Sequence, residues 1–460
     1  MIPFVGPSYT LANRKASVQR TVNMYLLGLE TPSKAPFILQ TVPGLSVFAA
    51  MGAPVRGLFQ AANRCFCVAG SVLYELSASG VATSRGTLNT STGPVDFAWG
   101  LTQLAIVDGP NGYTLNLNTN TFGVITAEGW LGSHRVAYLD GYFIFTDPDT
   151  QVFYLSAIDD ATTLDALAFA SAESTPDDVV AHLVDHRELW LLGETTTEVW
   201  FNSDAADFPF ARNNGASVEV GCAAKHSAQK IDSGLMWVGR DRNGSGMVYR
   251  SNGYQAVRVS SVAVEEALQG SADLSAARAW VYQQNGQTFY VLTAPGLSSS
   301  WVYEVSTGTW HERAELVAVD FAQWRGTCHA YVHGKHLVGD DAGNVYEMAS
   351  RFNSFAGSVI RRTRISPNQA TPARDRQFFG EFVMDCTTGG AAQGTEPVVE
   401  LSWSDDGGYR WGNPVQRSVG AVGEFLPRVI WHRLGNARDR VWRVDFTDAS
   451  PFSIISAEAR

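Results

Sequence analysis

The sequence predicts an all-β protein built around a β-propeller of six to seven blades, and three observations support this class. A strand–turn–strand pattern recurs seven times through residues 65–348, at intervals of 38 to 54 residues, and a propeller blade has a period of about 40–50 residues. Charged residues make up only 17% of the chain, which holds 43 glycines. Helical periodicity is confined to Ser261–Leu268 and Asp273–Ala279, with Asp273 as the expected cap. Since one blade cannot bury both of its faces alone, consecutive copies must stack around a common axis.

Each repeat joins an apolar strand to an aromatic one, as in CFCVAG followed by SVLYEL. Glycines such as Gly70 and Gly141 supply the turns, because glycine accepts positive φ at low cost. The second copy is weak, since it has asparagine in the aromatic column, and the spacing is irregular. The sequence therefore leaves two blade numbers open: seven, or six with a partial blade. The aligned column consists of Tyr74, Asn116, Tyr154, Trp200, Tyr249, Tyr303 and Tyr346.

The chain divides into four segments. Residues 1–54 lack the repeat and are predicted to form an extended N-terminal arm, which closes the propeller, lies across its face or reaches a neighbouring subunit. Residues 55–350 hold the blades. Residues 351–376 are basic and rich in Ser, Pro and Gly, which indicates a linker with a crossing strand. Residues 377–460 alternate apolar and polar residues in short runs, which favours a β-sandwich-like domain.

Charge and cysteine content restrict the function classes. A formal net charge of −11 argues against a protein that grips nucleic acid through its phosphates. An acidic surface instead keeps a protein soluble, or lines a passage to which DNA does not adhere. Five cysteines form no disulfide framework and suit folding in a reducing cytoplasm. We expect neither a signal peptide nor a membrane segment, since no stretch approaches the roughly 18 apolar residues required.

The segment SWSDDGGYRW is similar to the Asp-box turn of sialidases and related propellers. The matching positions are Ser404, Asp406, Gly408 and Trp411, while Arg410 stands where that motif prefers threonine. In the Asp-box the aspartate and glycine shape a hairpin turn, and the aromatic residue packs beneath it. We therefore predict a structural turn here. A glycan-binding or glycoside-hydrolysing propeller acting in receptor recognition is the alternative function.

The sequence offers no strong metal or catalytic site. In CHAYVHGKH, Cys328 precedes His329, His333 and His336, and the three histidines are minor metal candidates. Zinc requires three or four converging ligands, and no complementary CxxC pair exists elsewhere in the chain. Adjacent aspartates lie in turn-like sequence, where they would not form a catalytic pair. We expect no cofactor and no enzymatic activity.

Two local basic stripes stand out in this acidic chain, one in the linker and one in the last segment. Their alternation with apolar residues suits strands that bury one face and present arginines on the other. A solvated or subunit-facing sheet is favoured over a DNA contact, because single basic stripes are common on sheets. The candidate interface or DNA-facing residues are Arg361, Arg362, Arg364, Arg438 and Arg440.

Three segments carry a family resemblance that spans nearly the whole chain. They are the opening GPSYTLANRKASVQRTVNMYL with TVPGLSVF, the middle SAESTPDDVVAHLVDHRELWLLGETTTEVWF, and the ending LSWSDDGGYRWG with RVIWHRLGNARDRVWRVDFTD. Together they resemble the packaged-DNA stabilisation proteins of short-tailed bacteriophages, which form the tail hub or nozzle.

The resemblance implies a structural protein of the virion tail that folds first in the host cytoplasm. In that family six copies form a ring below the portal and its adaptor. The ring continues the DNA channel, closes it with the help of a tail needle or plug, and attaches tail fibres or spikes. The implied partners are thus other copies, the portal–adaptor ring, the needle and the fibres. Double-stranded DNA would pass transiently, without sequence-specific binding.

Overall fold

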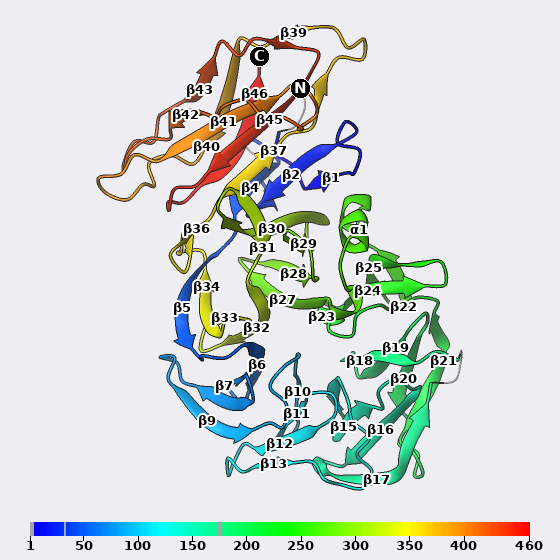
Figure 1. Ribbon diagram of the computed structural model, residues 1–460. Coiled ribbons are helices and arrows are strands. Elements are labelled where there is room, and N and C mark those ends of the chain that lie inside the picture. The colour runs from blue at the N-terminus through cyan, green and yellow to red at the C-terminus, as the bar shows by residue number, and fades with distance from the viewer. Residues whose placement is uncertain (1–3, 32–33, 173–175) are drawn as a thin grey trace.

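The computed structural model describes residues 4–31, 34–172 and 176–460, and almost all of its regular structure is β-strand. Seven antiparallel sheets follow one another around a common axis, and a second, smaller β domain stands beside this ring (Figure 1). The expected class, a propeller with a C-terminal β-sandwich, is confirmed. Among the described residues, no helix is long and apolar enough to cross a membrane.

The first four blades are regular four-stranded meanders, each formed by consecutive strands. Blade one consists of β6 (Val55–Ala61), β7 (Arg64–Ala69), β8 (Val72–Leu76) and β9 (Ala82–Thr87). Blade two consists of β10 (Asp96–Trp99), β11 (Gln103–Val107), β12 (Gly112–Asn116) and β13 (Phe122–Val124). Blade three consists of β14 (Val136–Leu139), β15 (Tyr142–Thr146), β16 (Val152–Ala157) and β17 (Asp160–Ser171). Blade four consists of β18 (Val179–Asp185), β19 (Glu188–Gly193), β20 (Thr197–Asn202) and β21 (Phe210–Val218).

The last three blades depart from this pattern. In blade five the innermost strand is split into two, and the sheet consists of β22 (Gly221–Cys222), β23 (Gln229–Ile231), β24 (Gly234–Asp241), β25 (Gly244–Asn252) and β26 (Gln255–Arg258). Blade six consists of β27 (Arg278–Gln284), β28 (Gln287–Thr293), β29 (Ser300–Glu304) and β30 (Thr309–Val317), which is extended by β31 (Asp320–Gln323). Blade seven consists of β32 (Gly326–Val332), β33 (Lys335–Asp340), β34 (Asn344–Ala349) and, from the N-terminal segment, β5 (Gly44–Ala50).

The ring is closed by the two ends of the propeller. Strand β5 pairs antiparallel with β34, from Asn344↔Ala50 to Ala349↔Gly44, and so supplies the fourth strand of blade seven. Apolar side chains of blade seven, including Leu337, share one buried cluster with Val55 of blade one. Corresponding clusters fill the interfaces between the other neighbouring blades. Both faces of each blade are therefore buried only when the ring is closed.

The aromatic column of the repeat lies on the third strand of every blade, so the seven repeats correspond to seven blades. The two short helical segments lie between blades five and six. They are α1 (Val262–Gln269) and a 3₁₀ turn at Leu274–Ala276, where the Asp273 carboxylate accepts a hydrogen bond from the Ser275 amide at 3.0 Å. The capping aspartate thus has the expected partner, and both segments begin within one residue of the predicted start.

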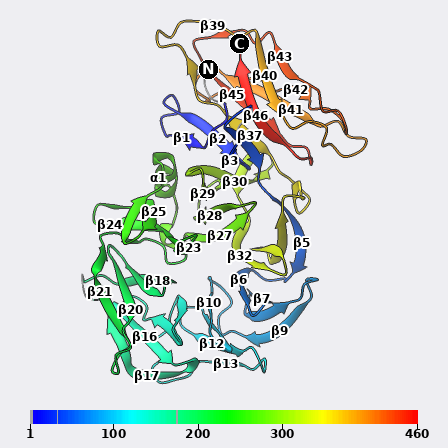
Figure 2. The ribbon, with the colours of Figure 1, turned by 180° about the vertical axis from the view of Figure 1, so that it is seen from behind.

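The second domain is a sandwich of two mainly antiparallel sheets, and the N-terminal segment contributes strands to both (Figures 1 and 2). One sheet consists of β2 (Val18–Val22), β37 (Arg362–Ile365), β45 (Asp439–Phe446), β41 (Val398–Ser404) and β42 (Val415–Ser418). The other consists of β3 (Met24–Gly28), β4 (Phe37–Thr41), β46 (Ser453–Ala459), β40 (Glu381–Cys386) and β43 (Val429–His432). Short flanking strands are β1 (Tyr9–Thr10), β35 (Ser354–Phe355), β36 (Ser358–Val359), β38 (Gln369–Ala370), β39 (Gln377–Phe378) and β44 (Asn436–Ala437).

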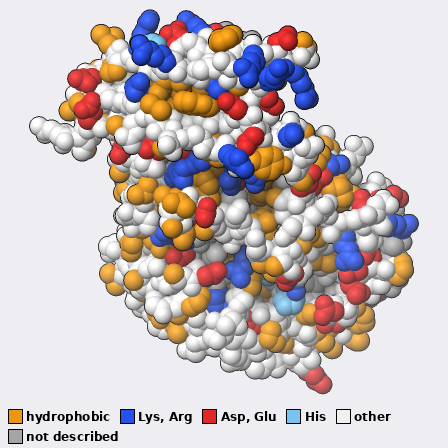
Figure 3. Space-filling model, turned by 45° about the horizontal axis from the view of Figure 1, so that its top comes forward, with side chains coloured by type: hydrophobic (Ala, Val, Ile, Leu, Met, Phe, Trp, Pro, Cys, Tyr) orange, Lys and Arg blue, Asp and Glu red, His pale blue; other side chains and the backbone are white. Residues whose placement is uncertain are grey.

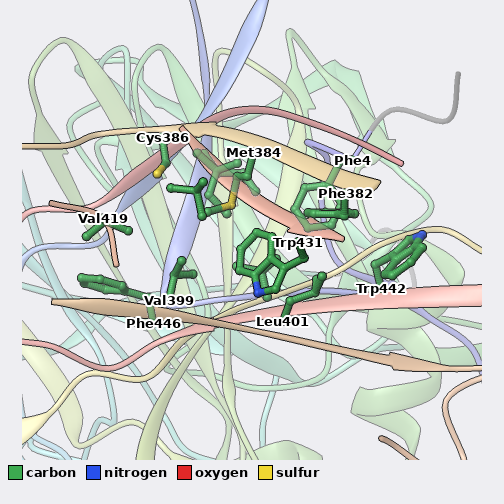
Figure 4. Packing of buried hydrophobic residues seen from close by; sticks show 14 of the residues in the cluster. Phe4, Phe382, Met384, Cys386, Val399, Leu401, Val419, Trp431, Trp442 and Phe446 are labelled. Carbon is green, nitrogen blue, oxygen red and sulfur yellow. The ribbon is translucent and has the colours of Figure 1, made fainter. Parts of the chain in front are cut away.

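The core of the sandwich lies between its two sheets and is rich in aromatic rings (Figure 4). Phe382 packs edge-on against Trp431, with ring centroids 5.7 Å apart, and tilted against Trp442 at 5.1 Å. Phe4 closes the same cluster with its ring 5.6 Å from that of Phe382. Such aromatic pairs favour offset and edge-to-face geometry. The start of the described chain is therefore part of the core of the C-terminal domain.

Candidate functional site at the junction of propeller and sandwich

Strand β2 joins the two domains into one continuous sheet. It pairs in parallel with β30 of blade six, Val22↔Glu312, and antiparallel with β37 of the sandwich. The Arg20 guanidinium donates to both carboxylate oxygens of Glu312, with distances of 2.6 to 3.0 Å. The Ser8 and Ser299 hydroxyls donate to the same carboxylate at 3.1 and 2.9 Å. Glu312 is only 3% exposed, so this bidentate pair is an anchor within the joint rather than a surface ion pair.

Asn23, directly after β2, locks the turn between the two sandwich sheets. It is fully buried and adopts a left-handed conformation with φ of 57°. Its side-chain amide donates to the carbonyls of Ala314 in the propeller and Arg361 in the sandwich, at 2.9 and 2.8 Å. Its side-chain oxygen accepts from the Ala314 amide at 2.9 Å. Asparagine tolerates this backbone region better than most residues, so one side chain holds the bend and both domains.

The structure corrects the expectation for three of the five candidate arginines. Arg362, Arg364 and Arg440 are at most 2% exposed, so they cannot meet DNA or a neighbouring subunit. Arg364 instead donates to the carbonyls of Phe4 and Pro7, at 2.6 and 2.9 Å, and ties the N-terminal segment to β37. Burial lowers the pKa of Arg364 to about 9 and that of Arg362 to about 10. The alternation correctly predicted a strand with an arginine-bearing face, but the N-terminal segment covers that face.

Arg440 and the two other arginines of that set, Arg361 and Arg438, are placed differently. Arg440 is buried between aromatic rings, with its guanidinium 4.8 Å from the Phe379 centroid, and pairs with Asp405 at 2.6 Å. Arg361 is partly exposed and bridges to Asp445 at 3.1 Å. Burial raises the pKa of Asp445, and the nearby Arg361 opposes that rise. Arg438 is exposed at the far end of the sandwich. Only Arg361 and Arg438 therefore lie where a partner can reach them.

The predicted turn is a tight hairpin between β41 and β42. Ser404 Oγ donates to Asp406 Oδ1 at 2.7 Å and accepts from the Gly408 amide at 2.9 Å. Asp406 Oδ1 also accepts from the amides of Tyr409 and Arg410 at 3.0 Å each, and these bonds lower the pKa of Asp406. Gly408 has a φ of 85°, which a side chain would strain. Trp411 packs beneath the turn against Val18, Ile365 and Val441.

A groove of about 830 Å³ lies between blade six, α1 and the sandwich. Its lining brings together Arg361, Gly408 and Trp411 from the sequence-predicted sets with Arg443 of the C-terminal basic stripe. It also includes Arg20 and Phe321, which the sequence analysis did not select. Arg443 pairs with Asp445 at 2.6 Å, so its charge and that of Arg361 converge on one carboxylate. Guanidinium groups beside aromatic rings suit contacts with polypeptide or anionic groups. This geometry favours binding and anchoring.

The histidine candidates do not converge. His329 and His336 are stacked, with His329 Nε2 and His336 Nδ1 3.1 Å apart, whereas His333 Nε2 faces the Leu76 carbonyl at 3.2 Å. Burial lowers the pKa of His329 to about 3. In the described part of the chain, no group of three His, Cys, Asp or Glu side chains is arranged to hold a metal ion. Cys328 is shielded at the interface of blades seven and one.

The residues at the centre of the joint were missed because they are distant in the sequence. Arg20 and Glu312 are separated by 292 positions, and no local pattern at either residue indicates the other as its partner. The sequence analysis assigned Arg20 to an extended arm, whose partner it left open. Long-range pairing of this kind depends on the closed ring, which places β30 beside β2.

Two interlocked β domains with a buried polar joint define a structural scaffold of the propeller–sandwich class. The comparison with protein-family models is specific: the propeller model of bacteriophage P22 Gp10 matches residues 10–352, and the β-sandwich model of the same protein matches residues 369–460. The chain belongs to this family of packaged-DNA stabilisation proteins. It is a structural protein of the phage virion.

Comparison with solved structures adds only weak likenesses. The designed Ika8 protein is 14% identical over 72% of this chain and 100% of its own, with a TM-score of 0.40. The N-terminal domain of Nup159 is 9% identical over 72% of this chain and 99% of its own, with a TM-score of 0.42. The β-propeller domain of Myceliophthora thermophila Cps50 (Swd1) is 8% identical over 66% of this chain and 99% of its own, with a TM-score of 0.43. No curated protein matches the chain.

Proposed function

We propose that the chain forms the hexameric tail hub of a short-tailed phage, docked below the portal–adaptor ring. In this position it continues and closes the DNA channel, and it anchors the tail needle and the fibres or spikes. One observation carries the proposal: the N-terminal segment contributes strands to both domains, through β5 in blade seven and β2 between blade six and the sandwich. A protein that resists the pressure of packaged DNA requires domains that cannot swing apart.

The charge distribution supports a DNA passage between copies of the protein. Residues 55–350 contain 16 Lys and Arg against 32 Asp and Glu, so the propeller is strongly acidic. Within one propeller, Arg135 at the start of blade three reaches across to the carbonyls of Lys225 and Ala228 in blade five, at 3.4 and 3.3 Å. The channel would therefore lie on the axis of the ring of copies. Acidic walls repel phosphates and permit transit with little adhesion.

The test is the mass and shape of the purified protein, alone and mixed with the portal–adaptor complex. Light scattering gives the number of copies, and negative-stain imaging shows where they bind. A ring of six copies on the adaptor is the expected result. A chain that stays monomeric and ignores the adaptor at micromolar concentration would overturn the hub assignment.

A further inference from the structure

Opposite charges are concentrated at opposite ends of this molecule. Blades three and four, residues 136–218, contain 15 Asp and Glu but only two Lys and Arg. Outside residues 55–350 the balance is reversed, with 18 Lys and Arg against 13 Asp and Glu. Lys and Arg side chains gather over the sandwich in Figure 3. Blade three lies at the end of the propeller away from the sandwich, and blade four follows it around the ring (Figure 1). The chain is thus a large electrostatic dipole.

The positive pole is a compact surface at the end of the sandwich. Strands β39 and β44 pair there, Gln377↔Ala437, which sets Arg376 beside Arg438. Arg438 Nη1 donates to the Arg374 carbonyl at 3.2 Å. We call this surface the arginine end: Arg374, Arg376, Phe378, Arg433 and Arg438.

The arginine end combines free positive charge with exposed apolar area. Its four arginines are exposed, and none has a carboxylate within 4.0 Å among the residues that the structure describes. The nearest acidic side chains in sequence are Asp375, which is exposed, and Asp439, which accepts from Asn368. The side chain of Phe378, two residues after Arg376, is 78% exposed. Arginine beside an exposed aromatic residue is the composition of an interface centre.

The negative pole carries a surface of the opposite kind. Strand β17 is the outer strand of blade three, and only β16 pairs with it. Between its paired positions the strand bulges outward and exposes Asp165 and Leu167, the latter 81% exposed, while Phe169 beside them is 49% exposed. The turn before β21 adds Asp204 and Asp207, both exposed. We call these five residues the acidic edge.

The turn and the strand belong to one surface, because the turn packs against blade three. Phe208 of the turn lies 5.6 Å from Phe153 of β16, centroid to centroid, and both share one buried cluster with Ala170 of β17. The two cations within blades three and four are already engaged, Arg187 with Asp140 at 2.8 Å and Arg212 with Glu198 at 3.7 Å. The acidic edge therefore keeps its negative charge and an apolar strip along the outer, unpaired edge of β17.

We propose that the arginine end of one copy docks on the acidic edge of a neighbouring copy. This inference rests on the proposed hexameric hub and names its contact surfaces. The two surfaces carry opposite charges and both expose apolar side chains. Two surfaces of the same kind would repel each other. Such a contact joins two different faces of the same chain, so it is heterologous and closes into a ring when the rotation between copies permits.

The test uses charge reversal in the full-length chain. One variant carries R374E, R376E, R433E and R438E, and a second carries D165K, D204K and D207K. The control is R428E, which reverses another exposed arginine in a different loop of the sandwich. Sedimentation velocity measures self-association at low and high salt, and thermal unfolding verifies that each variant is folded. Each reversal should weaken self-association at least about 100-fold, and the control should not.

Mixing the two variants separates this contact from a general charge effect. In an equimolar mixture, the reversed arginine end of the first variant can dock on the reversed acidic edge of the second. The native arginine end of the second variant can dock on the native acidic edge of the first. Both contacts join opposite charges, so assembly should return. Recovery in the mixture supports the proposal. Unchanged assembly of the arginine variant, or failure of the mixture to assemble, would overturn it, even if the wild-type ring still binds the adaptor. Loss of binding to duplex DNA with intact self-association would overturn it as well.

Discussion

The substitution Glu312→Gln tests whether the joint between propeller and sandwich carries the stability that its geometry implies. The change keeps the shape of the side chain and removes its charge. The buried carboxylate receives three hydrogen bonds from Arg20 and one each from Ser8 and Ser299. In the variant, the amide group of the glutamine faces the guanidinium, so that at least one charge-assisted bond becomes a repulsive contact.

The expected loss in the free energy of unfolding follows from the burial of Glu312. Removing one partner of a fully buried ion pair costs about 3–5 kcal/mol. The side chain of Arg20 is 26% exposed, so water partly compensates the cation. We therefore expect a loss of about 2–4 kcal/mol in the free energy of unfolding. The control is Glu347→Gln, because the partners of Glu347 are solvent-accessible cations: the side chains of Arg351 and Lys335 are 63% and 33% exposed. Its expected cost is at most about 1 kcal/mol.

Urea unfolding followed by tryptophan fluorescence measures both variants, and limited proteolysis reports whether the domains separate before they unfold. A double-mutant cycle with Arg20→Gln isolates the pair, for which we expect a coupling energy of at least about 1 kcal/mol. Equal stability of the Glu312 and Glu347 variants, together with zero coupling, would refute the view that this pair fastens the domains.

Three further predictions concern other parts of the fold. Arg364→Leu should leave the carbonyls of Phe4 and Pro7 without donors and make residues 4–10 sensitive to protease, whereas Arg438→Leu, an exposed member of the same predicted set, should not; equal protease resistance would contradict the assigned bonds. Deletion of residues 1–50 should prevent cooperative unfolding of the propeller, because blade seven loses β5. Thermal melting followed by circular dichroism measures this, and a truncated protein that melted like wild type would contradict the prediction. His182 and His329 both have folded pKa values of about 3, below their ordinary 6.5, so the unfolded chain binds protons first and stability should fall as pH drops from about 6.5 toward 3. Replacing either histidine by glutamine should flatten that dependence of the melting temperature, and an unchanged slope would count against it.

The repeat was readable from the sequence because each blade builds its strands from neighbouring residues. Alternation and glycine turns indicated the strands locally, and the aromatic column at Tyr74 and its equivalents marked the third strand of each blade. The fourth strand of blade seven was not readable, since β5 lies about 300 positions from β34. Closure of the propeller was one of three expectations for residues 1–54, but pairing over such a distance leaves no local trace that selects it.

The candidate arginines show the same limit. The pattern around Arg362 and Arg364 correctly indicated a strand with two unlike faces, and a polar face is normally the solvated one. Here backbone carbonyls of the N-terminal segment cover that face, which no periodicity could reveal. The turn at Ser404–Trp411 was recoverable because its hydrogen bonds run between residues at most four positions apart.

The sequence by itself determined the propeller, the sandwich and the charge of each, because period, alternation and composition are properties of local segments. The tertiary structure alone decided which arginines are buried, which strand closes the ring, and where the two domains are fastened. These features depend on contacts between residues hundreds of positions apart, whose free energy exists only once the closed ring has brought Arg20 and Glu312 together.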